Sequence, residues 1–155
     1  MTNQRTFQIA RVSLRVVLGA SFLVAISDRF GFLGPYGSRN VSWGDWNHFK
    51  QFVAVLNWFV PKALIPALAA LETVIEFALG AALLAGLYPR IVAWSSAALL
   101  TSFAITMSAS LGVIAPISYS VFTAAASALL LGAVTSPRRT QGSVKSFSSA
   151  WFAEP

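Results

Sequence analysis

The chain has 155 residues, of which 56% are hydrophobic and 10% are charged, and its mean hydropathy is +0.68. Soluble domains are about half apolar and a quarter charged, so this composition indicates an integral membrane protein. The formal net charge is +6, which in a soluble protein would suggest nucleic acid. Here the basic residues gather near the ends of apolar runs, where they set topology and meet anionic headgroups. We therefore expect the lipid bilayer, and no nucleic acid, as partner.

The residue types also limit the chemistry that the chain can carry. It has no cysteine and a single histidine, His48, which argues against disulfides, thiolate catalysis and a self-contained metal site. No nucleotide-binding, Ser-His-Asp or metalloprotease pattern occurs in the sequence. We therefore expect no metal, no covalently bound cofactor and no catalysis by the chain alone.

The apolar runs predict an all-α integral membrane four-helix bundle. Each run is near the roughly 20 residues needed to cross a bilayer, and the first is interpreted as a retained span, not a cleaved signal. The bundle forms one domain over residues 1–134, followed by a Ser-rich tail, 135–155, that we expect to be flexible and cytoplasmic. The predicted spans cover about 7–27, 63–87, 91–111 and 113–134.

The distribution of basic residues predicts the orientation. With the N-terminus inside, the inner side holds seven of the 11 basic residues and the outer side four. The inner residues are Arg5, Arg11, Arg15, Arg90, Arg138, Arg139 and Lys145, and the outer ones are Arg29, Arg39, Lys50 and Lys62. Cytoplasmic loops are the basic ones, so we expect a multi-pass protein of the bacterial cytoplasmic membrane with both termini in the cytoplasm.

The outer segment, 28–62, is too long for a simple turn. After a glycine-rich start, Ser42-x-x-Asp45 indicates the beginning of a helix, and apolar residues then recur at helical spacing until Pro61. With Trp43 and Trp46 beside it, this amphipathic helix is expected to lie at the extracytoplasmic interface or to cap the bundle. His48 is interpreted as an interfacial hydrogen-bonding residue, with a ligand role as the alternative.

Two glutamates, Glu72 and Glu76, lie inside the second span, where a carboxylate needs a partner or a function. The first span carries Arg15, roughly 12 Å from its inner end, and Glu76 lies roughly 17 Å from the inner end of the second. We therefore expect Arg15 to pair with Glu76. Such a pair can fix helix register, or it can line a polar pocket or proton relay.

Glu72 has two open interpretations. It can share protons with Glu76 as a dyad that faces a quinone or another small ligand. Alternatively, it faces the start of the outer loop, where Arg29 would pair with Glu72 and Asp28 would cap or hydrogen-bond the loop.

An ordered set of short motifs resembles a known family. The set comprises Arg11 and Arg15 opening the first span, Ser27-Asp-Arg-Phe-Gly at its end, Asn40-Val-Ser-Trp-Gly-Asp-Trp, Leu56-Asn-Trp-Phe-Val-Pro, Glu76-x3-Gly80 and Ala115-Pro-Ile-x-Tyr. Together they resemble the DoxX family of small four-span bacterial membrane proteins, over about residues 11–131. The resemblance implies a helical bundle associated with redox or oxidative-stress complexes, and it assigns no catalytic role to Arg15 or Glu76.

Three functions follow from these observations. The preferred one is an accessory subunit that anchors or completes a larger respiratory or redox complex with other membrane subunits, with quinone or lipid as a bound molecule. The second is a catalytic subunit of a quinone-linked oxidoreductase, in which Glu72 and Glu76 pass protons. The third is a small-molecule binding or transport protein, which predicts an enclosed cavity beside Glu76.

Overall fold

A computed structural model of the protein describes residues 2–135, and these residues contain helices and loops but no strand. The predicted all-α class is therefore confirmed for this part, whereas the predicted tail lies almost entirely outside it. The elements in chain order are α1 (Thr2–Arg29), α2 (Trp46–Leu56), the 3-10 helix η1 (Lys62–Leu64), α3 (Ile65–Ala85), α4 (Pro89–Leu111), α5 (Ile114–Ser118) and α6 (Val121–Thr135).

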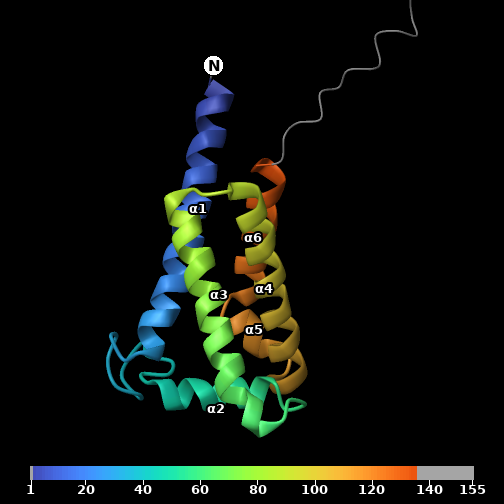
Figure 1. Ribbon diagram of the computed structural model, residues 1–155. Helices are drawn as coiled ribbons and strands as arrows, with labels where there is room; N and C mark the ends of the chain where they lie inside the picture. Colours follow the sequence, from blue (N-terminus) through green and yellow to red (C-terminus); the bar gives the residue numbers. More distant parts are fainter. Residues whose placement is uncertain (1, 136–155) are drawn as a thin grey trace, which may run out of the picture.

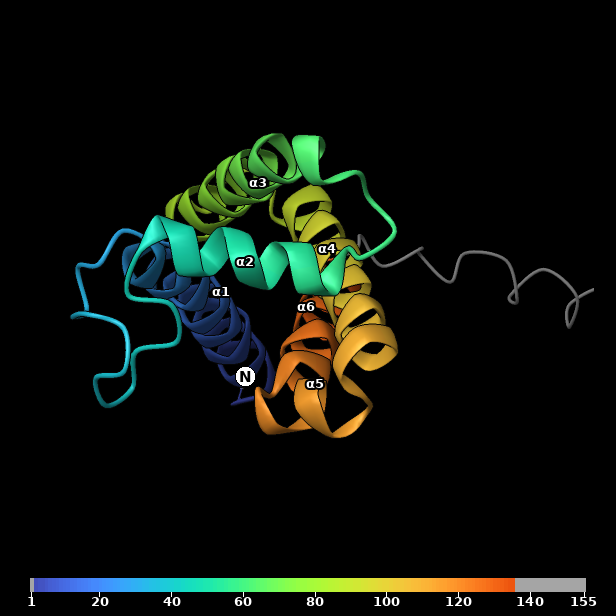
Figure 2. The ribbon, with the colours of Figure 1, turned by 90° about the horizontal axis from the view of Figure 1, so that it is seen from below.

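Four helices, α1, α3, α4 and α6, pack side by side, and α2 lies across one end of them (Figure 1). Seen from this end, α2 lies in front of the longer helices and runs from α1 towards α4 (Figure 2). We call this end the α2 end. The N-terminus of α1 and the last turn of α6 lie at the opposite end, where the first turns of α1 extend beyond the other helices (Figure 1).

In the part of the chain that the structure describes, three helical segments are long and apolar enough to cross a membrane: Gln4–Arg29, Lys62–Ala85 and Pro89–Leu111. They support a multi-pass membrane protein, and the first is longer than the predicted 7–27. The predicted continuous helix over 113–134 is interrupted, because the chain turns at Tyr119 and Ser120, where Ser120 has a φ of 57°. A residue in the left-handed conformation interrupts a right-handed α-helix. Because α6 alone is shorter than a typical span, the fourth span stays a prediction, in which α5 and α6 would cross the membrane together.

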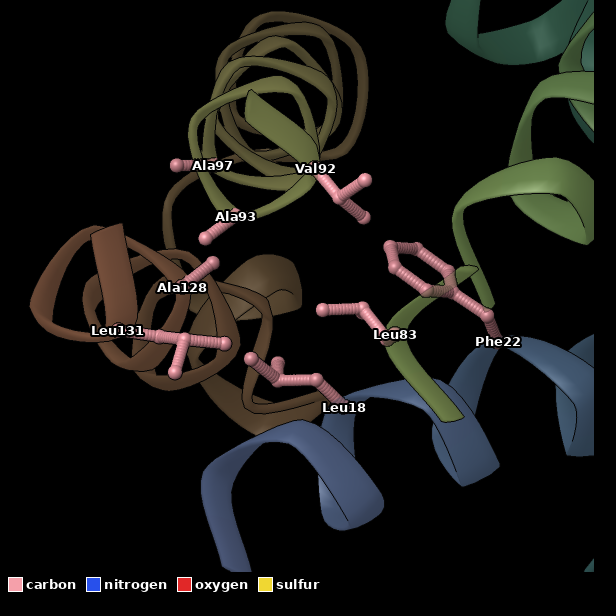
Figure 3. Packing of buried hydrophobic residues seen from close by; sticks show 8 residues of the cluster. All are labelled: Leu18, Phe22, Leu83, Val92, Ala93, Ala97, Ala128 and Leu131. Atoms are coloured by element: carbon pink, nitrogen blue, oxygen red, sulfur yellow. The ribbon is translucent and has the colours of Figure 1, made fainter. Parts of the chain in front are cut away.

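Small residues bring the helices close together at the core. Ala93 and Ala97 of α4 face Ala128 of α6, and Leu18, Leu83 and Leu131 fill the space between α1, α3 and α6 (Figure 3). Small side chains allow helix backbones to approach closely where lipid, not water, is the competing solvent. The larger apolar side chains on the opposite faces, such as Val17, Phe77 and Ile105, are exposed on the molecular surface and would face lipid.

Helices α1 and α3 run antiparallel and cross where two glycines meet. A Cβ placed on Gly19 would lie 3.0 Å from the carbonyl oxygen of Gly80, and one on Gly80 would lie 3.2 Å from that of Gly19. The crossing fixes which residues of the two helices lie level with each other. Residues that precede Gly19 therefore lie beside residues that follow Gly80, and residues that follow Gly19 lie beside residues that precede Gly80.

Helix α2 is amphipathic, as its apolar spacing predicts. It begins after Asp45, buries Phe49, Val53 and Leu56, and packs on Ile65 and Ala69 at the start of α3. It ends at Leu56 and not at the predicted stop, Pro61, because the chain leaves the helical conformation at Asn57, whose φ is −113° and ψ 49°.

Candidate functional site: a buried ion pair beside an apolar cavity

The centre of the site is an ion pair between Arg29, the last residue of α1, and Glu76 in the middle of α3. Nη2 of Arg29 lies 2.8 Å from Oε1 and 2.6 Å from Oε2 of Glu76, and both side chains are almost completely buried, at 4% and 2% exposure. Nη1 donates to Thr73 Oγ1 at 2.9 Å. Side chains on a helix lean toward its N-terminus. The Arg29 side chain therefore points back along α1 and reaches the middle of α3, where Glu76 lies.

Two aromatic rings hold the same arginine from the side of α2. The Cζ atom of Arg29 lies 4.0 Å from the centre of the Phe49 ring and 5.3 Å from that of Trp43. A guanidinium over an aromatic face is attracted to the ring, the more so when both are shielded from water. Arg29 therefore joins three elements: α1, α3 and the segment that leads into α2.

The preceding residue, Asp28, anchors the loop. Its Oδ2 accepts hydrogen bonds from the backbone nitrogens of Ser42 at 2.8 Å and Trp43 at 3.2 Å, and its Oδ1 accepts from Gly44 at 3.1 Å. Gly44 has a φ of 66°, and a Cβ there would collide with the backbone of Tyr36. Asp28 thus hydrogen-bonds the loop, as one of the two interpretations expected.

Beside the ion pair lies a cavity of about 550 Å³. Its wall comes from α1, α2, α3, α4 and the α5–α6 region, and Phe49, Phe52 and Val53 of α2 line it at the α2 end. Most of the lining is aliphatic or aromatic, and the polar residues include Arg29, Glu72 and Glu76. Cavities of 300–1,000 Å³ with apolar walls and a few polar groups are typical of ligand sites.

Glu72 lies one helical turn from Glu76 on the wall of this cavity and is partly exposed. The alternative in which Arg29 pairs with Glu72 is wrong, since the guanidinium binds Glu76 instead. Within residues 2–135, no Lys, Arg or His nitrogen forms a salt bridge with the Glu72 carboxylate.

The expected pair of Arg15 with Glu76 is also wrong. Arg15 donates from Nε to the carbonyl oxygen of Leu83 at 3.0 Å and from Nη2 to that of Leu84 at 3.3 Å. Arg15 precedes Gly19 by four residues and Glu76 precedes Gly80 by four, so the antiparallel crossing puts them about 12 Å apart along the axes. Arg15 instead caps the C-terminal end of α3, where a cation is favourable.

Asp45 and His48 lie at the start of α2, at the rim of the site. Asp45 is the N-cap: its Oδ1 accepts from the backbone nitrogens of Asn47 at 2.8 Å and His48 at 3.0 Å. Its Oδ2 lies 2.7 Å from Nδ1 of His48, whose ring stacks on Tyr36 at 3.9 Å. These hydrogen bonds, the one from the His48 backbone first, lower the pKa of Asp45 from its usual range. Trp46 stacks on Phe30 at 5.6 Å.

Sequence reasoning missed two contributors to the ion pair, Thr73 and Phe49. Thr73 precedes Glu76 by three residues and so lies on the same helix face, which was a signal that could have been used. Phe49 belongs to the apolar stripe of α2, and nothing in that stripe distinguishes the ring that meets an arginine from its neighbours. His48, in contrast, lines the cavity and hydrogen-bonds Asp45; its ligand role stays a prediction.

Comparison with known proteins corrects the family resemblance. A family model described as "Methylamine utilisation protein MauE" matches residues 6–118, well over half of the chain. This is a membrane protein family different from DoxX, so the resemblance to DoxX is wrong. The short motifs that suggested DoxX were individually unspecific. The chain matches no curated protein and no solved structure.

Proposed function

The chain belongs to the MauE family, and from this membership we propose that it is an accessory protein of a redox system for methylamine utilisation. It would sit in the bacterial cytoplasmic membrane, assist partner proteins and leave the chemistry to them. The family description names a utilisation protein and no reaction, which agrees with such a role.

The observation that carries this proposal is that the buried charged residues Arg29, Glu76 and Asp28 are used for contacts within the protein. Arg29 and Glu76 neutralise each other, and Asp28 holds three backbone nitrogens of the loop. These residues hold the loop and α2 on the ends of the longer helices. A buried arginine and glutamate that neutralise each other in this way are typical of a structural element, here an ordered surface at the α2 end.

That surface is suited to contact with other membrane-protein subunits. It exposes large aromatic side chains, among them Phe32, Tyr36, Trp58 and Phe59. Aromatic residues are enriched in protein interfaces and also in the headgroup region of membranes. We propose that part of this surface contacts a partner on the extracytoplasmic side.

A photo-crosslinking experiment tests the accessory role. A photoreactive phenylalanine analogue is placed at Tyr36, and the matched control carries it at Phe77, which is exposed on the apolar face of α3. After irradiation in the native host and mild-detergent extraction, we expect a protein adduct at position 36 and only lipid adducts at position 77. Lipid adducts alone at both positions, together with isolation of the chain only as a free monomer or homodimer, would overturn the proposal.

A second candidate function rests on the cavity of about 550 Å³ beside Glu76. An apolar cavity with a polar group on its wall favours a small-molecule binding protein over a purely structural one. Quinone or lipid remains the proposed occupant from the sequence. Native mass spectrometry of the chain released from nanodiscs would detect it. Replacement of the lining Ala25 by Trp fills the cavity and should remove the adduct, whereas Ala81→Trp on the exposed face of α3 should keep it.

A further inference from the structure

The free carboxylate of Glu72 distinguishes this cavity from a simple apolar void. Glu76 is held by Arg29 with both of its oxygens, whereas Glu72 forms no salt bridge or side-chain hydrogen bond within residues 2–135. A carboxylate that faces a largely apolar space needs a counter-charge or a proton. The described wall offers no cation that is free to supply it.

When Glu72 is ionised, the net charge of the cavity wall is −1. Its basic and acidic residues are Arg29, His48, Glu72 and Glu76. Arg29 and Glu76 cancel, and the histidine ring is already hydrogen-bonded to Asp45 outside the cavity. One uncompensated negative charge matches a ligand with one positive charge.

The aromatic lining points the same way. Phe22, Phe52, Phe103 and Tyr119 line the cavity, and the negative faces of such rings attract cations. The protein already uses this contact at the same site, where the guanidinium of Arg29 lies 4.0 Å from the centre of the Phe49 ring. A volume of about 550 Å³ leaves room for a compact organic cation with an apolar body.

We propose that the cavity binds a monovalent organic cation, a protonated amine or a quaternary ammonium, with Glu72 as its counter-ion. The apolar body of the ligand would lie against Phe22 and Phe103, and the ion pair of Arg29 with Glu76 would form the polar floor. This inference rests on the second proposed function, that the cavity is a ligand site, and it replaces quinone or lipid as the occupant with a cationic ligand.

Three probes that carry the same 2-phenylethyl group and different heads test the charge: phenethylammonium, 2-phenylethanol and 3-phenylpropionate. Binding of each is measured by calorimetry on the full-length chain in a non-ionic detergent, with empty micelles subtracted. We expect phenethylammonium to bind most tightly and to lose affinity on the order of tenfold or more in Glu72→Gln. Glu72→Asp keeps the charge and should retain binding, and this variant serves as the second test if Glu72→Gln does not fold.

The control for a general charge effect is Ser38→Lys, which raises the net charge by one, as Glu72→Gln does, in the exposed loop at the same end of the molecule but outside the cavity wall. It should leave phenethylammonium binding unchanged. If 2-phenylethanol binds as tightly as phenethylammonium or more tightly, and Glu72→Gln does not change its affinity, the proposed cationic ligand is wrong and the cavity is a site for neutral ligands. Preferred binding of the carboxylate would also overturn the cationic ligand, and no binding of any probe would remove the ligand site as well.

Discussion

Arg29 and Glu76, 47 positions apart in the chain, form a buried ion pair in which one guanidinium nitrogen lies within 2.8 Å of both carboxylate oxygens. The pair joins the end of α1 to the middle of α3, and the neighbouring Asp28 binds the loop. Two adjacent residues at the end of α1 therefore hold two different segments: Arg29 holds α3, and Asp28 holds the loop that leads into α2. Because residues of α2 line the cavity, the same contacts hold this part of its wall in place.

The contact between Asp28 and the loop leads to a first prediction. In Asp28→Asn, at least one of the amide groups at Ser42, Trp43 and Gly44 loses its charged acceptor, because the side-chain nitrogen cannot accept. We expect faster amide hydrogen exchange across residues 30–45 and a loss of stability of about 1–3 kcal/mol. The exchange is followed by mass spectrometry in detergent. Unchanged exchange at residues 42–44 would show that Asp28 does not hold the loop.

The glycine crossing leads to a second prediction. In Gly80→Leu, the new Cβ would lie 3.1 Å from the Cβ of Phe22 and 3.2 Å from the Gly19 carbonyl oxygen, so α1 and α3 would have to separate. We expect a loss of about 2 kcal/mol or more, measured as thermal unfolding in detergent. The control, Ala81→Leu, changes an exposed neighbour on the same helix and should unfold as the parent does. Equal stability of both variants would argue against the close crossing.

The proposed topology gives a third prediction, and the absence of cysteine makes it easy to test. Ser38 lies in the exposed loop and Gln4 in the exposed first turns of α1. With an impermeant thiol reagent on intact cells, we expect labelling of Ser38→Cys and none of Gln4→Cys until the membrane is opened. Labelling of Gln4→Cys in intact cells would show that the N-terminus lies outside and that the proposed orientation is wrong.

The N-cap of α2 gives a fourth prediction, a dependence on pH. Hydrogen bonds from His48 lower the pKa of Asp45 below its usual 3.8. A carboxyl whose pKa is lower in the folded state stabilises the fold above its unfolded pKa, and the contribution disappears as the pH falls through the folded pKa. We expect the fluorescence of the tryptophans beside the cap to change below about pH 4. In Asp45→Asn this component should be absent; an identical profile in both proteins would contradict the cap.

Several features of the fold could be read from the sequence because they depend on local patterns. Apolar length identified the three long helices, and the pattern Ser42-x-x-Asp45 before an apolar stripe indicated the start of α2, although the N-cap is Asp45 and not Ser42. The break at Ser120 could not be found in this way, since neither glycine nor proline occupies the position that takes the positive φ.

The ion pair was assigned to the wrong arginine for a tertiary reason. Depth was counted from the start of each apolar run, but the first turns of α1 extend beyond the other helices (Figure 1). The level of Arg15 is set by the crossing at Gly19 and Gly80, which depends on how two helices pack and not on where each begins. The same packing brings Arg29 to Glu76.

The most direct test of this account is a double-mutant cycle on Arg29 and Glu76, with Arg15 as the comparison. Arg29→Met or Glu76→Gln alone leaves a buried charge without its partner, so each should cost about 3 kcal/mol of stability. The double variant should cost clearly less than the sum of the two. Arg15→Met combined with Glu76→Gln should be additive, because these residues share no contact.

The measurement is the unfolding free energy of the five variants and the parent protein in the same detergent. Coupling between positions 29 and 76, with none between positions 15 and 76, is the result that the account predicts. Additive losses at positions 29 and 76, or coupling of Arg15 with Glu76, would contradict the ion pair on which the α2 end and its cavity depend.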